Sequence, residues 1–299
     1  MVLPPPLAPG SLVAVVAPAS PFSRDELFCG LAWLRTRYRL RLSPRILLRD
    51  GYLAGDDASR SAELSRAMLD PDIGAIVCAR GGYGAMRLLD ALPWDAFAAR
   101  PKWIAGFSDI TALHLQAAFR GVCSLHAPNV TGLGRSITAH ERLALIDPLE
   151  GRPALPWSDL EPLHVGQKRS PFMSARGPVV GGNLALVVSM AAAGRLLVPE
   201  HAIVVLEDVT ERPYRVDRML TSLRMGNHFA RASAIVFGGF TQCEPGPDGV
   251  SVTDVLRERT ADLGIPVLAG APFGHGAPNQ AFVHGATATL DGTTLRFTS

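Results

Sequence analysis

The chain has 299 residues, 47% of them hydrophobic and 19% charged, so it can bury a substantial core as one large domain or two ordinary ones. This is a globular composition, and it excludes a disordered acidic or basic tail. The formal net charge of +2 is close to neutral, with Lys and Arg scattered along the chain. It gives no electrostatic basis for binding nucleic acid or an anionic membrane.

Cysteine usage and the N-terminal segment indicate the compartment. Cys29, Cys78, Cys123 and Cys243 lie far apart and form no CxxC pair, which argues against structural zinc and a disulfide framework. The run "SLVAVVAPAS" lacks a basic n-region and its apolar stretch has only about six residues, so we predict a first buried strand and no signal peptide. No run approaches the roughly 18 apolar residues that span a bilayer. We therefore expect a soluble, cytoplasmic protein.

Residues 11 to 149 alternate short apolar runs with amphipathic stretches. We predict strands at "SLVAVVAP", "RILL", "GAIVCAR", "KWIAGF" and "GVCSLHAP", and helices near 23 to 37, near 58 to 69, from 84 and from 109. Continuous apolar strands separated by amphipathic helices indicate a parallel sheet with helices on both faces. In such sheets ligands bind beyond the carboxyl ends of the strands, where Arg80-Gly81-Gly82, Ser108 and His126 fall.

The second half follows a stretch rich in Pro, Gly and polar residues. We predict an N-terminal α/β domain over 1–150, a linker over 151–178 with one short strand near 162 to 166, and a C-terminal α/β domain over 179–299. The elements expected after the linker are helix "GGNLALVVSMAAA", strand "AIVVLE", helix "YRVDRMLTSLRM", strand "AIVFGGF", helix "VTDVLRERTADL" and strand "IPVLAG". In "ATATLDGTTLRF", Asp291-Gly292 predicts a type I′ hairpin.

The stretch "GFSDI", residues 106 to 110, places a serine at a bend between a predicted strand and a helix. There the first N–H groups of the helix and its dipole stabilise a developing negative charge, as in a nucleophile elbow. The usual G-x-S-x-G pattern is absent. The bend alone leaves three interpretations open, because Ser108 could be a helix N-cap followed by Asp109, a phosphate ligand or a nucleophile.

A serine nucleophile needs a base, and the base needs an orienting carboxylate. Glu207 ends the apolar run "AIVVLE", and His275 lies in the loop "APFGHGAPN" after the predicted strand "IPVLAG". Taken alone, Glu207 could equally pair with Arg212 or Arg215, and His275 could be a hydrogen-bonded structural residue. Because the serine, the acid and the histidine all follow predicted strand ends, their coincidence favours a catalytic triad.

The segment "ARGGYGAMRLL", residues 79 to 89, places three glycines between a buried strand and a helix. Its backbone can approach a ligand closely and present N–H groups. A phosphate cradle fits poorly, since the spacing matches neither G-x-G-x-x-G nor a P-loop and the turn has no Lys. An oxyanion hole needs the same backbone geometry. No HxxxH or HExxH spacing occurs, so we expect no metal ion and no cofactor. We expect His114 in the core or supporting the site, and His126 could line the site, although a structural hydrogen bond is favoured.

The motifs resemble those of the serine LD-carboxypeptidases, a family that includes the microcin C self-immunity peptidases. The matching segments, in the family's order, are "RGGYG" (80–84), "GFSDITALHL" (106–115), "HAPN" (126–129), "GGNLALV" (181–187), "LEDVTERPYRVDRML" (206–220) and "FGHG" (273–276). The resemblance extends over about residues 11 to 295. It implies an amidotransferase-like N-terminal α/β sandwich joined to a C-terminal α/β domain, an active site between them, and a homodimer.

The resemblance also implies roles for individual residues. Ser108 would be the nucleophile, Glu207 the acid and His275 the base, with backbone N–H groups of Gly82 and Asp109 as the oxyanion hole. The implied substrate is a muropeptide tetrapeptide, which loses its terminal D-alanine in peptidoglycan recycling.

Substrate contacts and departures from the family pattern complete the expectations. Arg80, Gly81 and Tyr83 are candidate substrate-binding residues, and Arg80 could instead form a structural ion pair. One departure is "HAPN" at 126 to 129, where the family commonly has His-Gly-Pro-Met. Two alternatives remain: a microcin C-type peptidase or amidase acting on peptidyl-nucleotides, and a ligand-binding homologue without activity.

Overall fold

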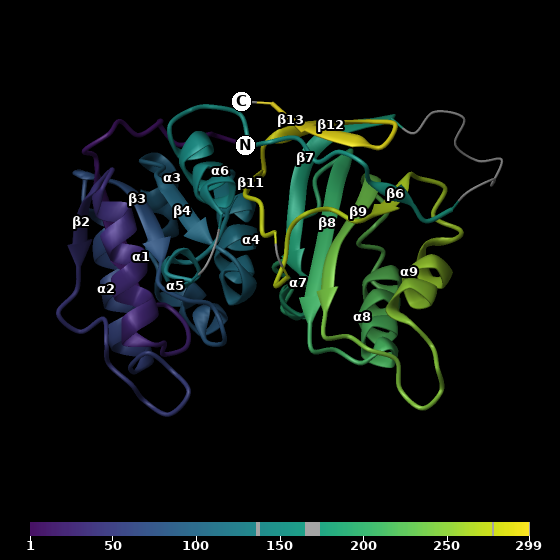
Figure 1. Cartoon of the computed structure of the whole chain (residues 1–299), viewed down its shortest axis with the longest axis horizontal. Helices are drawn as coiled ribbons and strands as arrows, with labels where there is room; N and C mark the ends of the chain where they lie inside the picture. The colour runs from purple at the N-terminus through teal and green to yellow at the C-terminus, as the bar shows by residue number, and fades with distance from the viewer. Residues whose placement is uncertain (136–137, 165–173, 277, 299) are drawn as a thin grey trace. The chain divides into compact units, whose positions relative to one another are not determined.

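The computed structural model describes residues 1–135, 138–164, 174–276 and 278–298, which form two compact units. Unit 1 comprises Met1–Ala154 together with Gln280–His284. Unit 2 comprises Leu155–Asn279 and Gly285–Thr298. Both units have the predicted α/β architecture with parallel strands (Figure 1).

Unit 1 alternates strands and helices as its apolar periodicity predicts. Its elements are β1 (Leu12–Val16), α1 (Arg24–Arg35), β2 (Arg39–Leu42), α2 (Asp57–Leu69), β3 (Ile73–Cys78), the 3-10 helix η1 (Ala85–Ala91), α3 (Trp94–Ala99), β4 (Trp103–Gly106), the 3-10 helix η2 (Ser108–Ile110), α4 (Thr111–Phe119), β5 (Ser124–His126), α5 (Val130–Leu133), α6 (Ala139–Leu149) and β11 (Phe282–His284). Within the described ranges they form one six-stranded sheet in the order β11-β5-β4-β3-β1-β2. Every pairing is parallel except that of β11 with β5.

The strand order of unit 1 determines which face each helix covers and where a ligand can bind. From β1 the chain moves to β2 at one edge, then returns across β1 to β3 and continues to β4 and β5. Right-handed crossovers in opposite directions place their helices on opposite faces, so α1 covers one face and α2 and α4 cover the other. The direction reverses between β1 and β3, and such a switch point opens a crevice at the carboxyl ends of the strands.

Two elements of unit 1 differ from the sequence-based expectation. The edge strand is β2, with the sequence "RLRL", while "RILL" at 45–48 lies in turns. An edge strand is half exposed and needs alternating polarity, which "RLRL" has and the more continuously apolar "RILL" does not. Strand β11 was not predicted, because it comes from the far end of the sequence and pairs with β5 through tertiary contact alone.

Unit 2 is built around a second sheet. Its elements are β6 (Glu161–Pro162), β7 (Ser174–Asn183), α7 (Leu184–Ala192), β8 (Ala202–Val209), α8 (Pro213–Met225), β9 (Ala232–Thr241), α9 (Val252–Thr260), β10 (Val267–Ala269), β12 (Thr287–Asp291) and β13 (Thr294–Phe297). The part of unit 2 that the structure describes holds a seven-stranded sheet in the order β13-β12-β7-β8-β9-β10-β6. The path from β7 to β10 advances in one direction, so right-handed crossovers place α7, α8 and α9 on one face. Figure 1 shows α8 beside α9.

Three local expectations in unit 2 need adjustment. The helix predicted from residue 181 begins at Leu184, because residues 181–183 complete β7 and Asn183 caps the helix. The C-terminal hairpin is present, but its two-residue loop is Gly292-Thr293, and only Gly292 has a positive φ (58°), which matches type II′ and not type I′. The short strand expected near 162 to 166 is β6, and residues 165–173 lie outside the described part of the chain.

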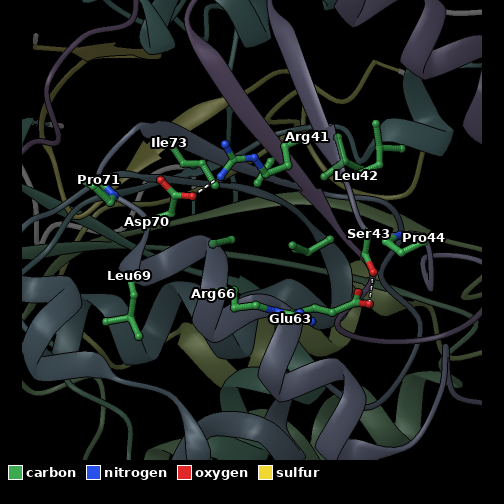
Figure 2. A pocket seen from close by; sticks show the side chains of 14 residues that line it. Arg41, Leu42, Ser43, Pro44, Glu63, Arg66, Leu69, Asp70, Pro71 and Ile73 are labelled. Carbon is green, nitrogen blue, oxygen red and sulfur yellow. Dashed lines mark hydrogen bonds and ion pairs between the residues drawn. The ribbon is translucent and has the colours of Figure 1, made fainter.

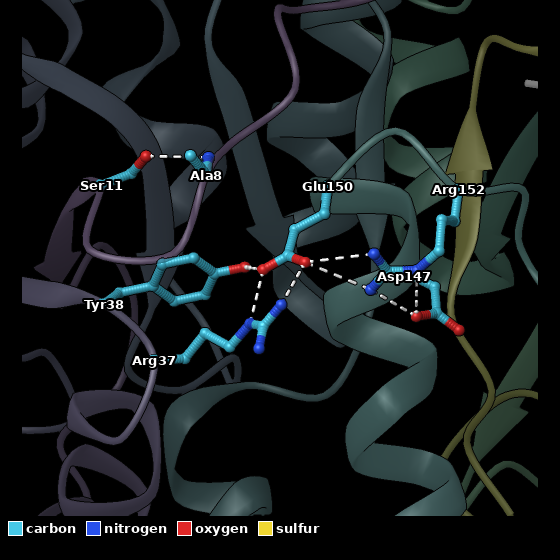
Figure 3. A network of polar contacts seen from close by, with 7 residues as sticks. All are labelled: Ala8, Ser11, Arg37, Tyr38, Asp147, Glu150 and Arg152. Carbon is cyan, nitrogen blue, oxygen red and sulfur yellow. Dashed lines mark hydrogen bonds and ion pairs between the residues drawn. The ribbon is translucent and has the colours of Figure 1, made fainter.

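A carboxylate network fixes the C-terminal end of α6 to the turn between α1 and β2 (Figure 3). Arg37 donates from Nε and Nη2 to the two Glu150 oxygens at 2.6 Å each, and the Tyr38 hydroxyl donates at 3.0 Å. Arg152 approaches the same carboxylate at 3.2 Å and pairs with Asp147 at 2.8 Å. Hydrogen bonds from Arg37 hold the pKa of Glu150 at about 2.

None of the helices in the described part of the chain combines the length and the apolar character needed to cross a bilayer.

Replacing Glu150 by Gln should lower the free energy of unfolding at pH 7 by about 1–3 kcal/mol, since its side chain is 5% exposed and its donors would lose a charged acceptor. The folded pKa lies below the unfolded value of about 4.3. The wild-type advantage should therefore be complete above about pH 5 and shrink as the pH falls toward 2. Urea unfolding at pH 7 and pH 3.5 measures both effects.

Asp95→Asn is the matched control, because the Asp95 carboxylate that pairs with Arg120 is 91% exposed and contributes little. Equal losses in the two variants, or a Glu150→Gln loss that does not change with pH, would contradict the assignment.

Candidate active site

Ser108 occupies a strained backbone position at the end of β4. Its φ is +66°, in the left-handed region that a non-glycine residue rarely adopts. The capping residue of η2 is the extended Phe107, and that of α4 is Ile110. A helix N-cap has extended dihedrals, so the N-cap interpretation of Ser108 does not fit. Strained residues of this kind cluster at functional sites.

Two buried side chains hold the Gly106–Phe107 peptide group, which lies directly before the bend. The Asn129 Oδ1 atom accepts a hydrogen bond from the Phe107 N–H at 3.2 Å, directly before Ser108. The His114 Nε2 atom lies 2.9 Å from the Gly106 carbonyl and Nδ1 lies 2.8 Å from the Ser124 hydroxyl. Because a carbonyl only accepts, Nε2 carries a proton, and in a neutral ring Nδ1 accepts from the Ser124 hydroxyl. Burial lowers the pKa of His114 to about 4, consistent with that state.

The glycine turn at residues 80–84 lies directly against the Ser108 bend. A Cβ atom on Gly81 would come within 2.8 Å of the Ser108 Cβ, 2.9 Å of the Phe107 carbonyl and 3.2 Å of the Asp109 nitrogen. Only glycine permits this approach, and it brings the two segments with the predicted oxyanion N–H groups together. Gly82, at φ +102°, leaves no room for a Cβ because Ser20 Oγ would be 2.5 Å away.

Hydrogen bonds with Ser20 and Asp109 hold this turn in place. The Ser20 N–H donates to the Gly81 carbonyl at 3.2 Å, and the Ser20 Oγ accepts from the Tyr83 N–H at 3.0 Å. The Asp109 carboxylate accepts from the Ala85 N–H at 2.7 Å, where η1 begins. Burial raises the pKa of Asp109 to about 6. The turn is therefore preorganised by hydrogen bonds on both sides.

In unit 2, Glu207 and His275 form a hydrogen-bonded pair. The His275 Nδ1 atom lies 2.7 Å from Glu207 Oε2; the carboxylate is fully buried and the imidazole is 19% exposed. The alternative partners bind elsewhere, since Arg215 pairs with Glu211 and Arg212 donates to the Pro245 carbonyl. A buried carboxylate on Nδ1 fixes the tautomer whose Nε2 can act as a base.

Asn183 supports this pair, a role that sequence reasoning missed. Its amide nitrogen donates to Glu207 Oε1 at 3.3 Å and to Asp208 Oδ1 at 3.0 Å, while its Oδ1 accepts from the Leu186 N–H. Asp208 also accepts from the Ala185 N–H at 3.0 Å. Burial, with a smaller contribution from the Glu207 charge, raises the pKa of Asp208 to about 6. The available signal was an Asn preceding an apolar helix, which is typical of an N-cap.

An irregularity in β9 places the His275 loop near Glu207. The β8–β9 register shifts between Leu206 and Asp208. In the displaced stretch the Gly239 N–H donates to the Phe273 carbonyl at 3.0 Å, and Gly238 leaves no room for a side chain beside Phe273. Bulged strands commonly redirect backbone next to active sites.

The candidate substrate residues lie at the edges of the glycine turn. Arg80 donates to the Pro21 carbonyl at 2.5 Å, so the structural ion pair considered for it is replaced by a backbone contact. Tyr83 is 52% exposed and meets the 64% exposed Tyr52 edge to face, with ring centroids 5.6 Å apart. Tyr52 was not singled out by the sequence, because only the fold brings its turn next to residue 83.

Within each unit the predicted residues come together. Unit 1 gathers Ser108, Gly81, Gly82 and Asp109 at the carboxyl ends of β3 and β4, and unit 2 pairs Glu207 with His275. Among the described residues, no group of three or more His, Cys, Asp and Glu is arranged to hold a metal ion.

A separate hollow of about 570 Å³ lies on unit 1 between α2 and the strands β1 and β2 (Figure 2). Of its polar groups, Arg41 pairs with Asp70 and the Ser43 hydroxyl donates to Glu63, and none of the predicted site residues lines it.

A strained serine at a strand end and a buried carboxylate–imidazole pair on an α/β scaffold are features typical of serine hydrolases. Family models agree with this class. Residues 13–127 match the LD-carboxypeptidase N-terminal domain and residues 176–290 match the LD-carboxypeptidase C-terminal domain. The chain belongs to the LD-carboxypeptidase family, so the resemblance predicted from the six motifs is confirmed.

Individual relatives are similar along the whole chain. The murein tetrapeptide carboxypeptidase of Pseudomonas aeruginosa is 36% identical over 95% of this chain and 94% of its own length. The crystal structure of a muramoyltetrapeptide carboxypeptidase from Oxalobacter formigenes has a TM-score of 0.85 at 25% identity, covering 96% of this chain and 99% of that one. The microcin C7 self-immunity protein of Escherichia coli is 26% identical over 96% of this chain and 92% of its own length.

Gly274→Ala should break the pair formed by His275 and Glu207. The new Cβ would lie 2.9 Å from Glu207 Oε2, at a backbone φ of +124°. We expect the carboxylate to move away from Nδ1, the low-field Nδ1–H proton resonance to disappear, and the melting temperature to fall. Proton NMR and thermal unfolding measure these changes.

Gly249→Ala separates the clash from the backbone strain, because Gly249 has φ +73° and open space around its Cβ position. A Gly274→Ala protein that keeps the low-field resonance would contradict the packing argument.

Proposed function

We propose that this protein is a serine carboxypeptidase that hydrolyses the L,D-peptide bond before the terminal D-alanine of muropeptide tetrapeptides. The observation that carries the proposal is the 2.7 Å contact between the buried Glu207 carboxylate and His275 Nδ1. A carboxylate held out of water and directed at an imidazole favours the cation that forms when the ring takes a proton. Family membership supports the peptidase class.

The proposed mechanism follows from the roles of the three residues. His275 Nε2 removes the proton from the Ser108 hydroxyl as Oγ attacks the carbonyl carbon, and Glu207 stabilises the resulting imidazolium. The oxyanion accepts hydrogen bonds from the backbone N–H groups of Gly82 and Asp109. The imidazolium then protonates the departing D-alanine nitrogen, the C–N bond breaks, and water hydrolyses the acyl-enzyme by the same route in reverse order.

The substrate assignment rests on two supports. The relatives named murein tetrapeptide carboxypeptidase and muramoyltetrapeptide carboxypeptidase are similar over nearly the whole chain. An exopeptidase must also recognise a free carboxylate, and Arg80, at the start of the glycine turn, is the cation we assign to it. Gly81 and Tyr83 would contact the substrate from the same turn.

A second candidate is a peptidase or amidase acting on peptidyl-nucleotides. It is favoured by the similarity to the microcin C7 self-immunity protein along 96% of the chain. The catalytic residues would be the same, so only the substrate separates the two activities.

The proposal includes a cytoplasmic location and a homodimer. Four cysteines, none in a disulfide and Cys78, Cys123 and Cys243 buried, support a reducing compartment. The dimer is implied by the family resemblance.

Conversion of Ser108 to Ala should lower D-alanine release from a purified tetrapeptide by about 10³–10⁶-fold, because the attacking oxygen is lost while the binding contacts remain. His275→Ala should cause a loss of similar size, and the double variant should be hardly worse than either single one. Mass spectrometry of tetrapeptide and tripeptide over time measures the rate. Ser61→Ala, a surface hydroxyl that contacts only its own helix in the described structure, is the matched control.

Undiminished turnover by Ser108→Ala would overturn the mechanism. Hydrolysis of an aminoacyl-sulfamoyl nucleoside in place of the tetrapeptide would favour the second candidate, and labelling of Ser108 by a serine-directed phosphonate would count against a homologue without activity.

A further inference from the structure

Arg60 is a buried cation that the proposed mechanism does not use. It lies in the first turn of α2, and its side chain is 1% exposed. An arginine is almost never this buried without several acceptors, because an unpaired charge in the interior is costly. The hydrogen-bond acceptors around Arg60 therefore indicate which part of the structure it holds in place.

The acceptors of Arg60 are three backbone carbonyls and one carboxylate. Nη1 donates to the Gly84 carbonyl at 3.0 Å and to the Pro18 carbonyl, Nε donates to the Gly55 carbonyl at 3.1 Å, and Nη2 pairs with Asp57. Gly84 is the last residue of the "RGGYG" turn, and Pro18 lies in the loop after β1. One guanidinium thus joins the two loops that flank the switch point between β1 and β3.

The other contacts of these loops converge on the candidate oxyanion hole. The loop that starts at Pro18 continues to Ser20, which hydrogen-bonds both Gly81 and Tyr83. Gly82 lies between those two residues. The positive charge of Arg60 also favours ionisation of Asp109, whose carboxylate holds the Ala85 N–H directly after the turn.

Gly84 and the Arg60 side chain are sterically complementary. Gly84 has φ +124°, and a Cβ there would come within 2.8 Å of Arg60 Nη1. The third glycine of the motif therefore provides the space that the guanidinium occupies. A lysine could keep the charge, but one ammonium on a flexible stem lacks the planar fork of donors that reaches carbonyls on separate loops.

We propose that Arg60 is a positioning residue for the oxyanion hole: it fixes the 80–84 turn against the loop after β1 and so keeps the Gly82 N–H aimed at the developing oxyanion. The inference rests on the proposed function of Ser108 and Gly82. An oxyanion hole stabilises the transition state more than the bound substrate. Loss of Arg60 should therefore lower kcat and leave substrate affinity nearly unchanged.

The experiment compares Arg60→Lys and Arg60→Met with Arg66→Met, an exposed arginine two turns further along α2. We expect kcat for the tetrapeptide to fall by about 10- to 100-fold in both Arg60 variants, since misplacing one oxyanion donor costs at most about 10²–10³-fold. Isothermal titration of intact tetrapeptide, with and without Arg60→Lys in the Ser108→Ala background, should give Kd values within about threefold. Arg66→Met should match the wild type.

A second readout does not depend on the natural substrate. The rate at which a simple fluorophosphonate modifies Ser108, followed by intact mass, also needs the oxyanion hole and should fall in parallel with kcat. The wild-type protein could release no D-alanine while the fluorophosphonate still modifies the Arg60 variants more slowly than the wild type. That result would reject the substrate assignment and still support the role of Arg60. If Arg60→Met does not fold, Arg60→Lys and Gly84→Ala test the inference, because a Cβ on Gly84 would displace the Arg60 guanidinium.

Three results would overturn the inference. One is an unchanged kcat in folded Arg60→Lys and Gly84→Ala proteins. Another is a Kd that weakens as much as kcat falls, which would make Arg60 a binding or purely structural residue. The third is a wild-type protein in which Ser108 reacts with neither reagent, because the proposed oxyanion hole would then serve no nucleophile.

Discussion

The left-handed backbone at Ser108 is the constraint on which unit 1 depends. A non-glycine residue in this region costs of order 1–3 kcal/mol and persists only where its surroundings over-determine it. The surroundings here are Asn129 on the Phe107 N–H, neutral His114 on the Gly106 carbonyl, and the close approach of Gly81. Both hydrogen bonds are made to main-chain atoms of Gly106 and Phe107, so they hold the bend through the backbone.

Unit 2 meets a different constraint, which is the placement of two carboxylates next to each other at the end of β8. Successive residues of a strand point to opposite sides, and Glu207 receives His275 while Asp208 accepts the Ala185 N–H near the start of α7. Asn183 donates to both. The raised pKa of Asp208 reflects burial first and the Glu207 charge second. The Ala185 N–H and the Asn183 amide thus supply hydrogen-bond donors to these two neighbouring carboxylates.

The sequence predicts the parts of this structure that depend on local pattern. Apolar runs followed by Gly-rich or polar residues locate the carboxyl ends of β3, β4 and β8, and the motif order identifies the family. Asn129 shows the limit of such reasoning. It stands where the family commonly has Met, and its value as an acceptor for Phe107 N–H is visible only once β4 and β5 lie side by side.

The local sequence pattern does not predict contacts between residues that are far apart in the chain. Strand β11 reaches β5 from more than 150 residues away, and its short apolar sequence has no periodicity that marks it as an edge strand. Arg60 is similar, since an arginine in the first turn of a helix reads as a surface residue. Its burial becomes apparent only when the crossover from β2 to β3 carries α2 over the switch point. The residues missed are therefore those whose acceptors come from other loops.

Each half of the proposed site is held by hydrogen bonds within its own unit, and this has an energetic consequence. In the described contacts Asn129 bonds to Phe107, and Asn183 bonds to Glu207, Asp208 and Leu186, so the effects of substituting them on the free energy of unfolding should add. Under the proposed mechanism their effects on turnover need not add, because the nucleophile and the base would act in the same step. If the effects on stability add while the effects on turnover do not, Asn129 and Asn183 support separate parts of one reaction site. Two unrelated structural residues would not show this combination.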